Sequence, residues 1–206
     1  VSIHALARLA ETRDPETGKH LRRTQEYVLT LAKRLADHSR FCHYLDQKTI
    51  DALVQSAPLH DIGKVGIPDH VLLKSGKLTP EEWEIMKTHA ELGCNAIAQA
   101  EADAEKPVGF LAIAKLIARS HHEKWDGSGY PDGLAGDDIP IAARLMALAD
   151  VFDALTCKRV YKPAFSFDDA YRIIVDSRGQ HFDPDVVDAF VSDFETFKTI
   201  ASNYAE

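Results

Sequence analysis

Histidines close to acidic residues are the most informative feature of this chain, which has ten histidines among 206 residues. His60 and Asp61 are neighbours at the end of an apolar helical segment. Glu16 and His20 are four residues apart, so on a helix both side chains project from one face, about one turn apart. Imidazole and carboxylate groups bind first-row divalent metals. One such pair is weak evidence for a metal site, because helix ends often carry these residues. The two pairs together indicate a metal site.

A further histidine lies on a helix whose start the sequence predicts. Residues 79–82, Thr-Pro-Glu-Glu, form a capping box with proline at the first helical position. We expect this helix to carry Trp83, Met86 and His89 inward. His89 therefore joins the candidate metal ligands.

Two adjacent histidines and one aspartate complete the set. His121 and His122 end an apolar helical segment and lie about 100° apart on a helix, so they more easily serve two metals than one. Asp150 lies in the apolar segment 141–155, where an unpaired carboxylate would cost several kcal/mol. It is expected to bind metal, with a buried salt bridge as the alternative. This set predicts a multinuclear site without thiolates, which favours iron, manganese or zinc over copper(I).

Helices are the elements that must position these side chains. Apolar residues recur at helical spacing over 21–35, 50–57 and 141–155, and no strand alternation competes with them. Asp183 followed by proline predicts another helix start. Residues 125–140 are rich in glycine and proline and predict an ordered loop. Since no repeat or composition shift marks a second domain, we expect a single all-α domain.

Composition narrows the class of protein. With 45% hydrophobic and 27% charged residues, the chain has the balance of a soluble globular domain. It lacks an apolar run of roughly 20 residues and a leader segment, which predicts a cytoplasmic protein without a membrane partner. The net charge of −8 argues against binding duplex nucleic acid. We expect the three cysteines to be buried free thiols: Cys42, Cys94 and Cys157.

Taken in order, these motifs resemble the HD-GYP phosphodiesterases, a bacterial branch of the HD metal-dependent phosphohydrolases. The resemblance covers nearly the whole chain and is carried by residues 11–20, 60–69, 121–131, 149–156 and 181–184. It implies one HD-type helical bundle over residues 1–206, with residues 125–140 as an ordered GYP loop. Residues 1–15 are then expected to form a linker helix from an upstream regulatory domain.

The resemblance also implies an activity, the hydrolysis of cyclic di-GMP to pGpG or on to GMP by attack of a metal-activated water on phosphorus. It implies that Asp61 bridges metals and that Glu16 belongs to a three-metal variety, so two or three ions are expected, iron or manganese first. The implied ligands are Glu16, His20, His60, Asp61, His89, His121, His122 and Asp150.

Substrate contacts are implied at four further positions. Lys64 would stabilise phosphoryl oxygens as negative charge builds, so it and Asp61 are the expected catalytic residues. Tyr130 offers a ring and a hydroxyl to a guanine or a phosphate. Arg159 and Lys162 match family positions that contact the phosphates and bases of the ligand.

Two residues depart from the family pattern in the segment that contains Arg159. Val160 stands where proline is common, and Cys157 stands where a small hydroxyl residue is usual. Neither is a metal ligand. Without proline at 160 the backbone of Arg159 is less constrained, so a modest loss of affinity is expected.

Two alternatives to this activity stay open from sequence. One is a non-catalytic module that binds cyclic di-GMP or a partner such as a GGDEF-type diguanylate cyclase, which the intact ligand positions argue against. The other is a phosphodiesterase for a different cyclic dinucleotide such as cyclic GMP-AMP. An upstream receiver or sensor domain and a homodimer are further expected partners, because a short amphipathic N-terminal helix often transmits signals through a dimer.

Overall fold

The chain is helical throughout the residues that this computed structural model describes, which are 7–10, 13, 19–104, 108–157 and 164–204. Within those ranges two isolated bridges are the only β-type pairing, and no helix has the length and apolar composition to cross a bilayer. The α-helices in chain order are α2 (His20–Leu35), α3 (Gln47–Ser56), α4 (Asp69–Leu72), α5 (Pro80–Lys87), α6 (His89–Ala102), α7 (Gly109–Ser120), α8 (Ile141–Thr156), α9 (Phe167–Asp176), α10 (Pro184–Ser192) and α11 (Phe194–Asn203). Three short 3-10 turns join them: η1 (Ala57–Leu59), η2 (Ile62–Gly66) and η3 (Gly136–Asp138). The all-α prediction is confirmed.

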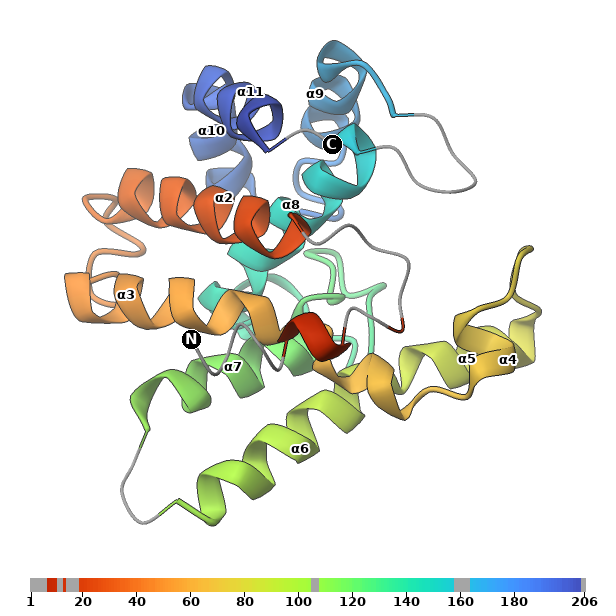
Figure 1. Cartoon of the computed structure of the whole chain (residues 1–206). Coiled ribbons are helices and arrows are strands. Elements are labelled where there is room, and N and C mark those ends of the chain that lie inside the picture. Colours follow the sequence, from red (N-terminus) through yellow and green to blue (C-terminus); the bar gives the residue numbers. More distant parts are fainter. Residues whose placement is uncertain (1–6, 11–12, 14–18, 105–107, 158–163, 205–206) are drawn as a thin grey trace.

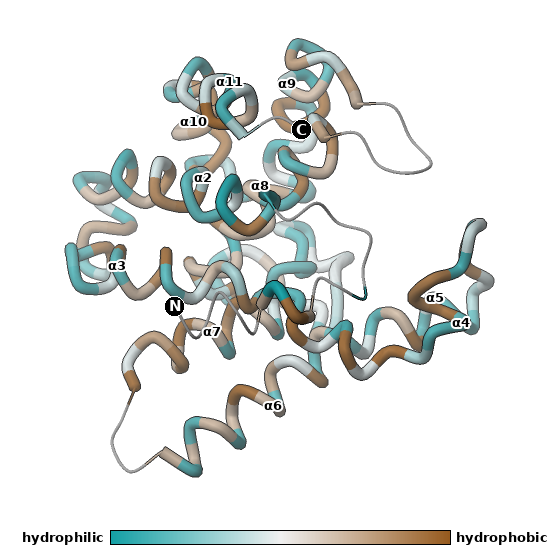
Figure 2. The backbone as a smooth tube through the Cα atoms, in the orientation of Figure 1, coloured by the Kyte–Doolittle hydropathy of each residue, from teal (hydrophilic) through white to brown (hydrophobic). Residues whose placement is uncertain are grey.

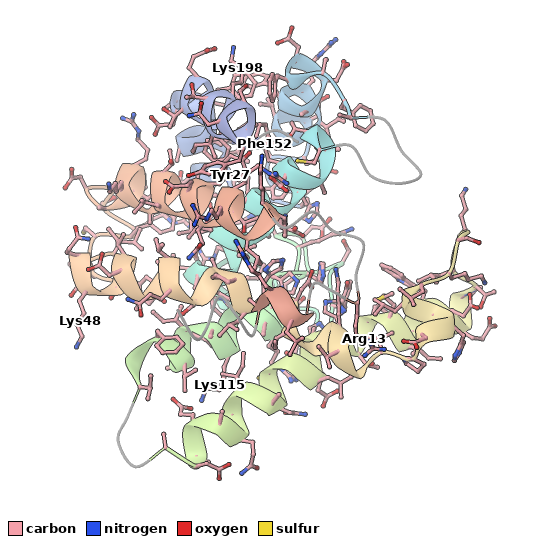
Figure 3. All side chains as sticks on the ribbon, viewed as in Figure 1. Arg13, Tyr27, Lys48, Lys115, Phe152 and Lys198 are labelled. Atoms are coloured by element: carbon pink, nitrogen blue, oxygen red, sulfur yellow. The ribbon has the colours of Figure 1, made fainter. Side chains whose placement is uncertain are left out.

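Helices α2 and α8 pack against each other at the centre of the main hydrophobic core. Tyr27 of α2 stacks on Phe197 at 4.7 Å between ring centres and meets Phe152 of α8 edge to face at 5.2 Å. Figure 3 shows Tyr27 and Phe152 side by side where the two helices meet. All three rings are fully buried, and each contributes about 1.5–3 kcal/mol relative to an exposed side chain. This packing fixes the two helices that carry His20 and Asp150.

Helices α6 and α7 form a second layer and enclose a smaller apolar cluster. Its buried members are Ala7, Leu21, Leu59, Ile97, Ala114 and Ala118. Leu59 precedes His60 and Leu21 follows His20. The packing of this cluster therefore fixes the backbone beside two candidate ligands. Figure 1 shows α4 and α5 projecting from the helical body, and Figure 2 shows hydrophobic residues gathered on them. We call residues 69–87 the α4–α5 arm.

Arg13 ties the N-terminal part of the chain to the base of the α4–α5 arm (Figure 3). Its guanidinium donates hydrogen bonds to the carbonyls of Val65 and Ile67 and forms an ion pair with Asp69. The neighbouring positions 11–12 and 14–18, which include Glu16, lie outside the described residues. The expected linker helix over 1–15 is likewise described only at 7–10, which are helical, and at Arg13.

Buried polar groups hold the GYP loop against the helices. Glu123 accepts hydrogen bonds from the backbone N–H groups of Asp132 at 2.7 Å and Leu134 at 3.1 Å. On the other side, Arg144 donates to Asp183 at 2.9 Å, and its guanidinium lies 5.4 Å from the centre of the Trp125 ring. An ordered loop, as the sequence predicts, is confirmed.

The predicted helix starts are also confirmed, whereas two expectations about burial are wrong. Thr79 and Glu82 exchange both hydrogen bonds of a capping box, and Asp183 accepts from the N–H of Asp185 at 2.9 Å. Trp83 does not point into the core but is 46% exposed, and His89 lies on a separate helix, because α5 ends at Lys87 and α6 begins at His89. The cysteines are free thiols, but Cys42 is exposed and the other two are half-buried.

Candidate metal centre

Four of the predicted ligands form one compact group. Asp61, His89, His121 and His122 each offer a ligand atom, and these atoms all lie within 4.8 Å of one another. Asp61 lies between η1 and η2, His89 is the first residue of α6, and the two adjacent histidines follow the end of α7. His121 and His122 fall in this same group, with their rings 3.9 Å apart and tilted by 42°, so that they serve two different metals stays a prediction.

Three more predicted ligands form a second group beside the first. His20 is the first residue of α2, His60 follows η1, and Asp150 lies within α8. The Nε2 atoms of His20 and His60 are 3.4 Å apart, and His20 Nε2 is 3.7 Å from Asp150 Oδ1. Two neighbouring groups of this composition are what a multinuclear site requires.

Asp61 lies between the two groups and faces both of them. Its Oδ1 atom is 3.3 Å from His89 Nε2 and 3.5 Å from His121 Nε2. Its Oδ2 atom is 3.4 Å from His60 Nε2 and 2.7 Å from Lys64 Nζ. One carboxylate oxygen therefore serves each group, which is the geometry of a bridging ligand.

Hydrogen bonds turn the histidine rings so that their Nε2 atoms face inward. Each Nδ1–H donates to a fixed oxygen, and the four acceptors are Asp153 Oδ2 for His20 at 2.7 Å, Ala57 O for His60 at 2.9 Å, Met86 O for His89 at 2.7 Å and Ile117 O for His121 at 2.9 Å. A neutral imidazole that donates through Nδ1 keeps its lone pair on Nε2. Metal-binding histidines in proteins are held in this way.

Three atoms at the centre of the site are buried without a hydrogen bond. They are Asp61 Oδ1, His89 Nε2 and His121 Nε2, all members of the first group. A buried polar atom left unpaired costs about 1–3 kcal/mol, so a native protein rarely gathers three of them. A cation bonded to all three satisfies them together. The residues present therefore fit divalent metal ions.

Electrostatics favour the metal-binding protonation states of Asp61, His121 and His122. Burial alone would raise the pKa of Asp61, but the Lys64 ammonium and His60 hold it well below its ordinary value. Burial and the neighbouring His121 hold the pKa of His122 well below its ordinary value, and burial lowers that of His121. His60 is the exception, because the Asp61 carboxylate raises its pKa against the effect of burial. Ionised carboxylates and neutral imidazoles are the forms that bind metals.

Gly63 permits the close approach that brings Asp61 to His89, and sequence reasoning assigned it no role. A Cβ atom at Gly63 would lie 1.9 Å from His89 O and 2.5 Å from the backbone nitrogen of Gly93. Only glycine fits there. Its position two residues after Asp61 is a signal that the sequence does offer, because glycine next to a ligand often marks tight backbone packing.

A pocket of about 310 Å³ opens over the two groups. Lys64, Tyr130 and Asp150 line it together with Asp61. The predicted catalytic lysine and the predicted substrate-binding tyrosine thus face the same space as the ligands. The rest of the wall consists of Leu72, Leu78, Trp83, Met86, His89, His122 and Ala154.

His122, which lies shortly before the GYP loop, holds Tyr130 in place. The Tyr130 ring stacks on that of His122 at 4.8 Å and 25°, and its backbone N–H donates to His122 O at 3.2 Å. Gly129 allows this contact, because a Cβ there would lie 2.4–2.6 Å from backbone atoms of His122, Glu123 and Lys124. Burial raises the pKa of Tyr130, so its hydroxyl stays protonated at neutral pH. Arg159 and Lys162 lie outside the described residues.

Comparisons with known proteins agree with this architecture. The HD domain family matches residues 4–186. A cyclic di-GMP phosphodiesterase of Vibrio cholerae is 56% identical over 209 residues, covering 100% of this chain and 42% of the relative. A 3'3'-cGAMP-specific phosphodiesterase 2 of the same organism is 39% identical over 201 residues, covering 98% of this chain and 36% of the relative. The crystal structure of a cyclic GMP-AMP phosphodiesterase from V. cholerae superposes with a TM-score of 0.66 at 18% identity, covering 97% of this chain and 50% of that one.

Fold and site together define an all-helical domain with a clustered histidine–aspartate centre that fits divalent metal ions. The chain belongs to the HD domain family, and the resemblance recognised in its motifs is confirmed. It spans less than half the length of two of the curated relatives that it matches, covering 46% of one and 42% of the other.

Proposed function

We propose that this chain is a metal-dependent phosphodiesterase that hydrolyses cyclic di-GMP to pGpG, with GMP as the product of a second cleavage. The observation that carries the proposal is the position of Asp61, whose two oxygens face two separate groups of inward-turned ligands. The relative with 56% identity, a cyclic di-GMP phosphodiesterase, supports the choice of substrate.

We assign the metal-binding role to both groups of the centre, with iron or manganese as the ions. Asp61 is the bridging ligand, and the full proposed set is Glu16, His20, His60, Asp61, His89, His121, His122 and Asp150. Bound divalent ions at such a centre lower the pKa of a water and withdraw charge from phosphate oxygens. Glu16 is assigned to a third ion from the family resemblance alone.

Lys64 supplies the positive charge that the reaction needs beside the phosphorus. Its Nζ lies 2.7 Å from Asp61 Oδ2 and faces the pocket, with only 16% of its side chain exposed. An ammonium held at this place attracts the phosphoryl oxygens and stabilises the charge that they gain in the transition state. Because the ion pair fixes the lysine beforehand, little reorganisation is required.

Substrate binding is assigned to the open side of the pocket. The protonated hydroxyl of Tyr130 can donate a hydrogen bond to a phosphate oxygen or accept one from a base. Arg159 and Lys162 are assigned to the phosphates and bases from the family resemblance. We expect Tyr130→Phe to keep the metals and the ring contact with His122 while weakening substrate binding.

A time course with purified protein tests the proposal. Cyclic di-GMP and 3'3'-cGAMP are each incubated under reducing conditions with iron(II) or manganese(II), and products are separated by chromatography. Metal content is measured on the same samples, and Asp61→Ala runs beside the wild type. We expect pGpG and then GMP from cyclic di-GMP with wild type only, and a loss of metal from the variant.

Each other outcome points to a different conclusion. Full activity in Asp61→Ala would refute the assignment of the metal centre. If cyclic di-GMP stays intact although metals are bound, the chain is a receptor rather than a cyclic di-GMP phosphodiesterase. If 3'3'-cGAMP is cleaved instead, that dinucleotide is the substrate, as for the relative with 39% identity. Two metals per chain with pGpG as the final product would refute the proposed second cleavage to GMP.

A further inference from the structure

Trp83 of the α4–α5 arm carries an exposed aromatic surface at the mouth of the pocket. Its side chain is 46% exposed, and it is the one aromatic among the exposed large hydrophobic residues of the described chain. Covering this surface with a ligand would be favourable. Ligand pockets are lined mainly by apolar and aromatic side chains, so an exposed aromatic in the pocket wall is placed to contact a ligand.

The other aromatic ring of the pocket is already occupied. Tyr130 stacks on His122 at 4.8 Å, meets His89 edge to face at 6.4 Å, and has the Nζ atom of Lys87 at 5.9 Å from its ring centre. Trp83 meets Tyr130 edge to face, at 6.1 Å and 82°. Since this contact occupies at most one face of the indole and Trp83 is 46% exposed, the ring has surface left for a ligand. Trp83 is therefore the aromatic ring of the pocket that is available to stack on a ligand.

The pocket joins two kinds of wall. The candidate ligands Asp61 and Asp150 and the ammonium of Lys64 line the pocket and suit a phosphodiester. Four residues of the α4–α5 arm add an apolar part of the wall: Leu72, Leu78, Trp83 and Met86. A nucleotide has the matching pair of chemistries, a charged phosphate and a flat, apolar-faced base. A ligand with its phosphorus at the metals therefore directs a base toward Trp83.

Glu82 holds the arm in this arrangement before any ligand binds. Its carboxylate accepts from the N–H of Thr79 at 2.7 Å and forms an ion pair with Lys74, so the start of α5 is tied to the preceding turn. Because Trp83 follows Glu82 directly, the same contacts fix the backbone position of Trp83. A ring positioned in advance loses little conformational entropy when it binds.

We propose that Trp83 stacks on a nucleobase of the cyclic dinucleotide and thereby sets its KM, leaving the chemical step to the metal centre. This inference rests on the proposed phosphodiesterase function. It makes Trp83 a specificity-determining residue that selects ligands carrying a base over simple phosphodiesters. Stacking on an aromatic side chain is tolerant of base identity, so both cyclic di-GMP and cyclic GMP-AMP would use it.

Kinetics of three variants test the proposal. Trp83→Ala removes the ring, and we expect KM for cyclic di-GMP to rise about tenfold to hundredfold with kcat and metal content little changed. Trp83→Phe keeps a flat ring and should restore most of the affinity. Ile85→Ala is the matched control, because Ile85 lies on the same helix, is 37% exposed and does not line the pocket. Its KM should equal that of the wild type.

A binding measurement separates the base from the phosphate without relying on turnover. The chain has two tryptophans, so Trp125→Phe leaves Trp83 as the only indole. We expect GMP to quench its fluorescence in the metal-loaded protein and ribose 5-phosphate to leave it unchanged. Quenching by both or by neither would overturn the stacking assignment.

The two proposals fail in distinguishable ways. If wild type hydrolyses cyclic di-GMP and Trp83→Ala has the same KM, the stacking inference is wrong and the phosphodiesterase function stands. If wild type hydrolyses neither dinucleotide, the proposed function is wrong, and the quenching titration alone decides whether Trp83 contacts a base.

Discussion

The Nδ1–H group of His20 donates to Asp153 Oδ2 at 2.7 Å, and this bond aims His20 Nε2 at His60 and Asp150. Asp153 is itself held by Arg23, whose Nε donates to Oδ1 at 2.6 Å. All three side chains are almost completely buried. Burial would raise the pKa of Asp153, but the bonds from His20 and Arg23 bring it below its ordinary value, so the carboxylate is ionised. A buried anion thus fixes the tautomer and the direction of a proposed ligand.

Replacing Asp153 by asparagine is expected to weaken metal binding by about 10–100-fold, because the group that orients His20 is lost. The same change removes the buried charge that pairs with Arg23, which keeps the Tyr204 carbonyl as an acceptor, at a cost of about 3–5 kcal/mol in the free energy of unfolding. Metal titration of activity and urea unfolding distinguish the two effects, since excess metal should restore turnover in the folded fraction. A variant that binds metal as tightly as wild type would show that Asp153 only stabilises the fold.

Cys157→Ser is the matched control for this prediction. Cys157 Sγ donates to the same Asp153 oxygen at 3.7 Å, and serine keeps a donor there. Burial raises the pKa of the thiol to about 12, so it is a neutral group that serine replaces without a change of charge. We expect metal affinity and turnover close to those of wild type, which would also show that the departure from the family pattern at this position is harmless.

Lys64→Ala is expected to reduce kcat by about 10²–10³-fold while the metals stay bound, because one preorganised charge beside the phosphate is removed. Lys64→Arg keeps the charge and should recover part of the loss. Steady-state kinetics with metal content measured on each preparation check the prediction. A parallel loss of metal and activity would instead mean that Lys64 acts through Asp61, its partner at 2.7 Å.

The histidines and aspartates that the structure groups together could be identified as candidates from the sequence, because each carries its own chemical signal. His60 and Asp61 end an apolar helix, and Asp150 interrupts another, so their placement near a buried centre followed from periodicity. Residues that act by packing gave weaker signals. The sequence predicts one helix through His89, but α5 ends at Lys87 and α6 begins at His89, and no glycine or proline marks this break. It also predicts an inward Trp83, which is 46% exposed.

Roles that depend on pairing over long sequence distances were not accessible from the sequence either. Asp153 is one turn beyond Asp150 and was passed over, since its partners His20 and Arg23 lie 130 or more residues away. The grouping of His121 and His122 with Asp61 and His89 depends on where the end of α7 lies relative to two other segments, which is a property of the folded backbone. Local pattern identifies candidate ligands, and tertiary contacts decide how they are grouped.

Gly63→Ala is expected to disrupt the metal centre although no ligand is changed. The added Cβ would lie 1.9 Å from His89 O, so η2 and α6 must move apart and separate Asp61 from His89. We expect lower stability and reduced metal content. Gly76→Ala is the control, because a Cβ at that position meets nothing within 4 Å. Thermal unfolding and metal analysis of both variants check the prediction, and normal metal content in Gly63→Ala would contradict it.

His181 is expected to make the metal-free protein less stable in acid. Burial, helped by the charge of Lys124, lowers its pKa from 6.5 to about 4, against the opposing influence of Asp126 and Asp150. Between these two values the unfolded chain takes up a proton that the folded chain does not, so stability falls as pH drops through this window. The full effect of this one group is at most about 3 kcal/mol, at 1.36 kcal/mol for each unit of the shift.

Urea unfolding of wild type and His181→Asn at pH 7 and pH 5 measures this contribution. At pH 7 the imidazole is largely neutral in both states, so any difference between the proteins there reflects packing and can be subtracted. Lowering the pH to 5 should destabilise wild type more than the variant, by up to about 2 kcal/mol. His121 and His122 also have lowered pKa values and act in the same direction, but they are common to both proteins and cancel. Equal losses in the two proteins would mean that His181 takes up its proton in the folded state near its ordinary pKa.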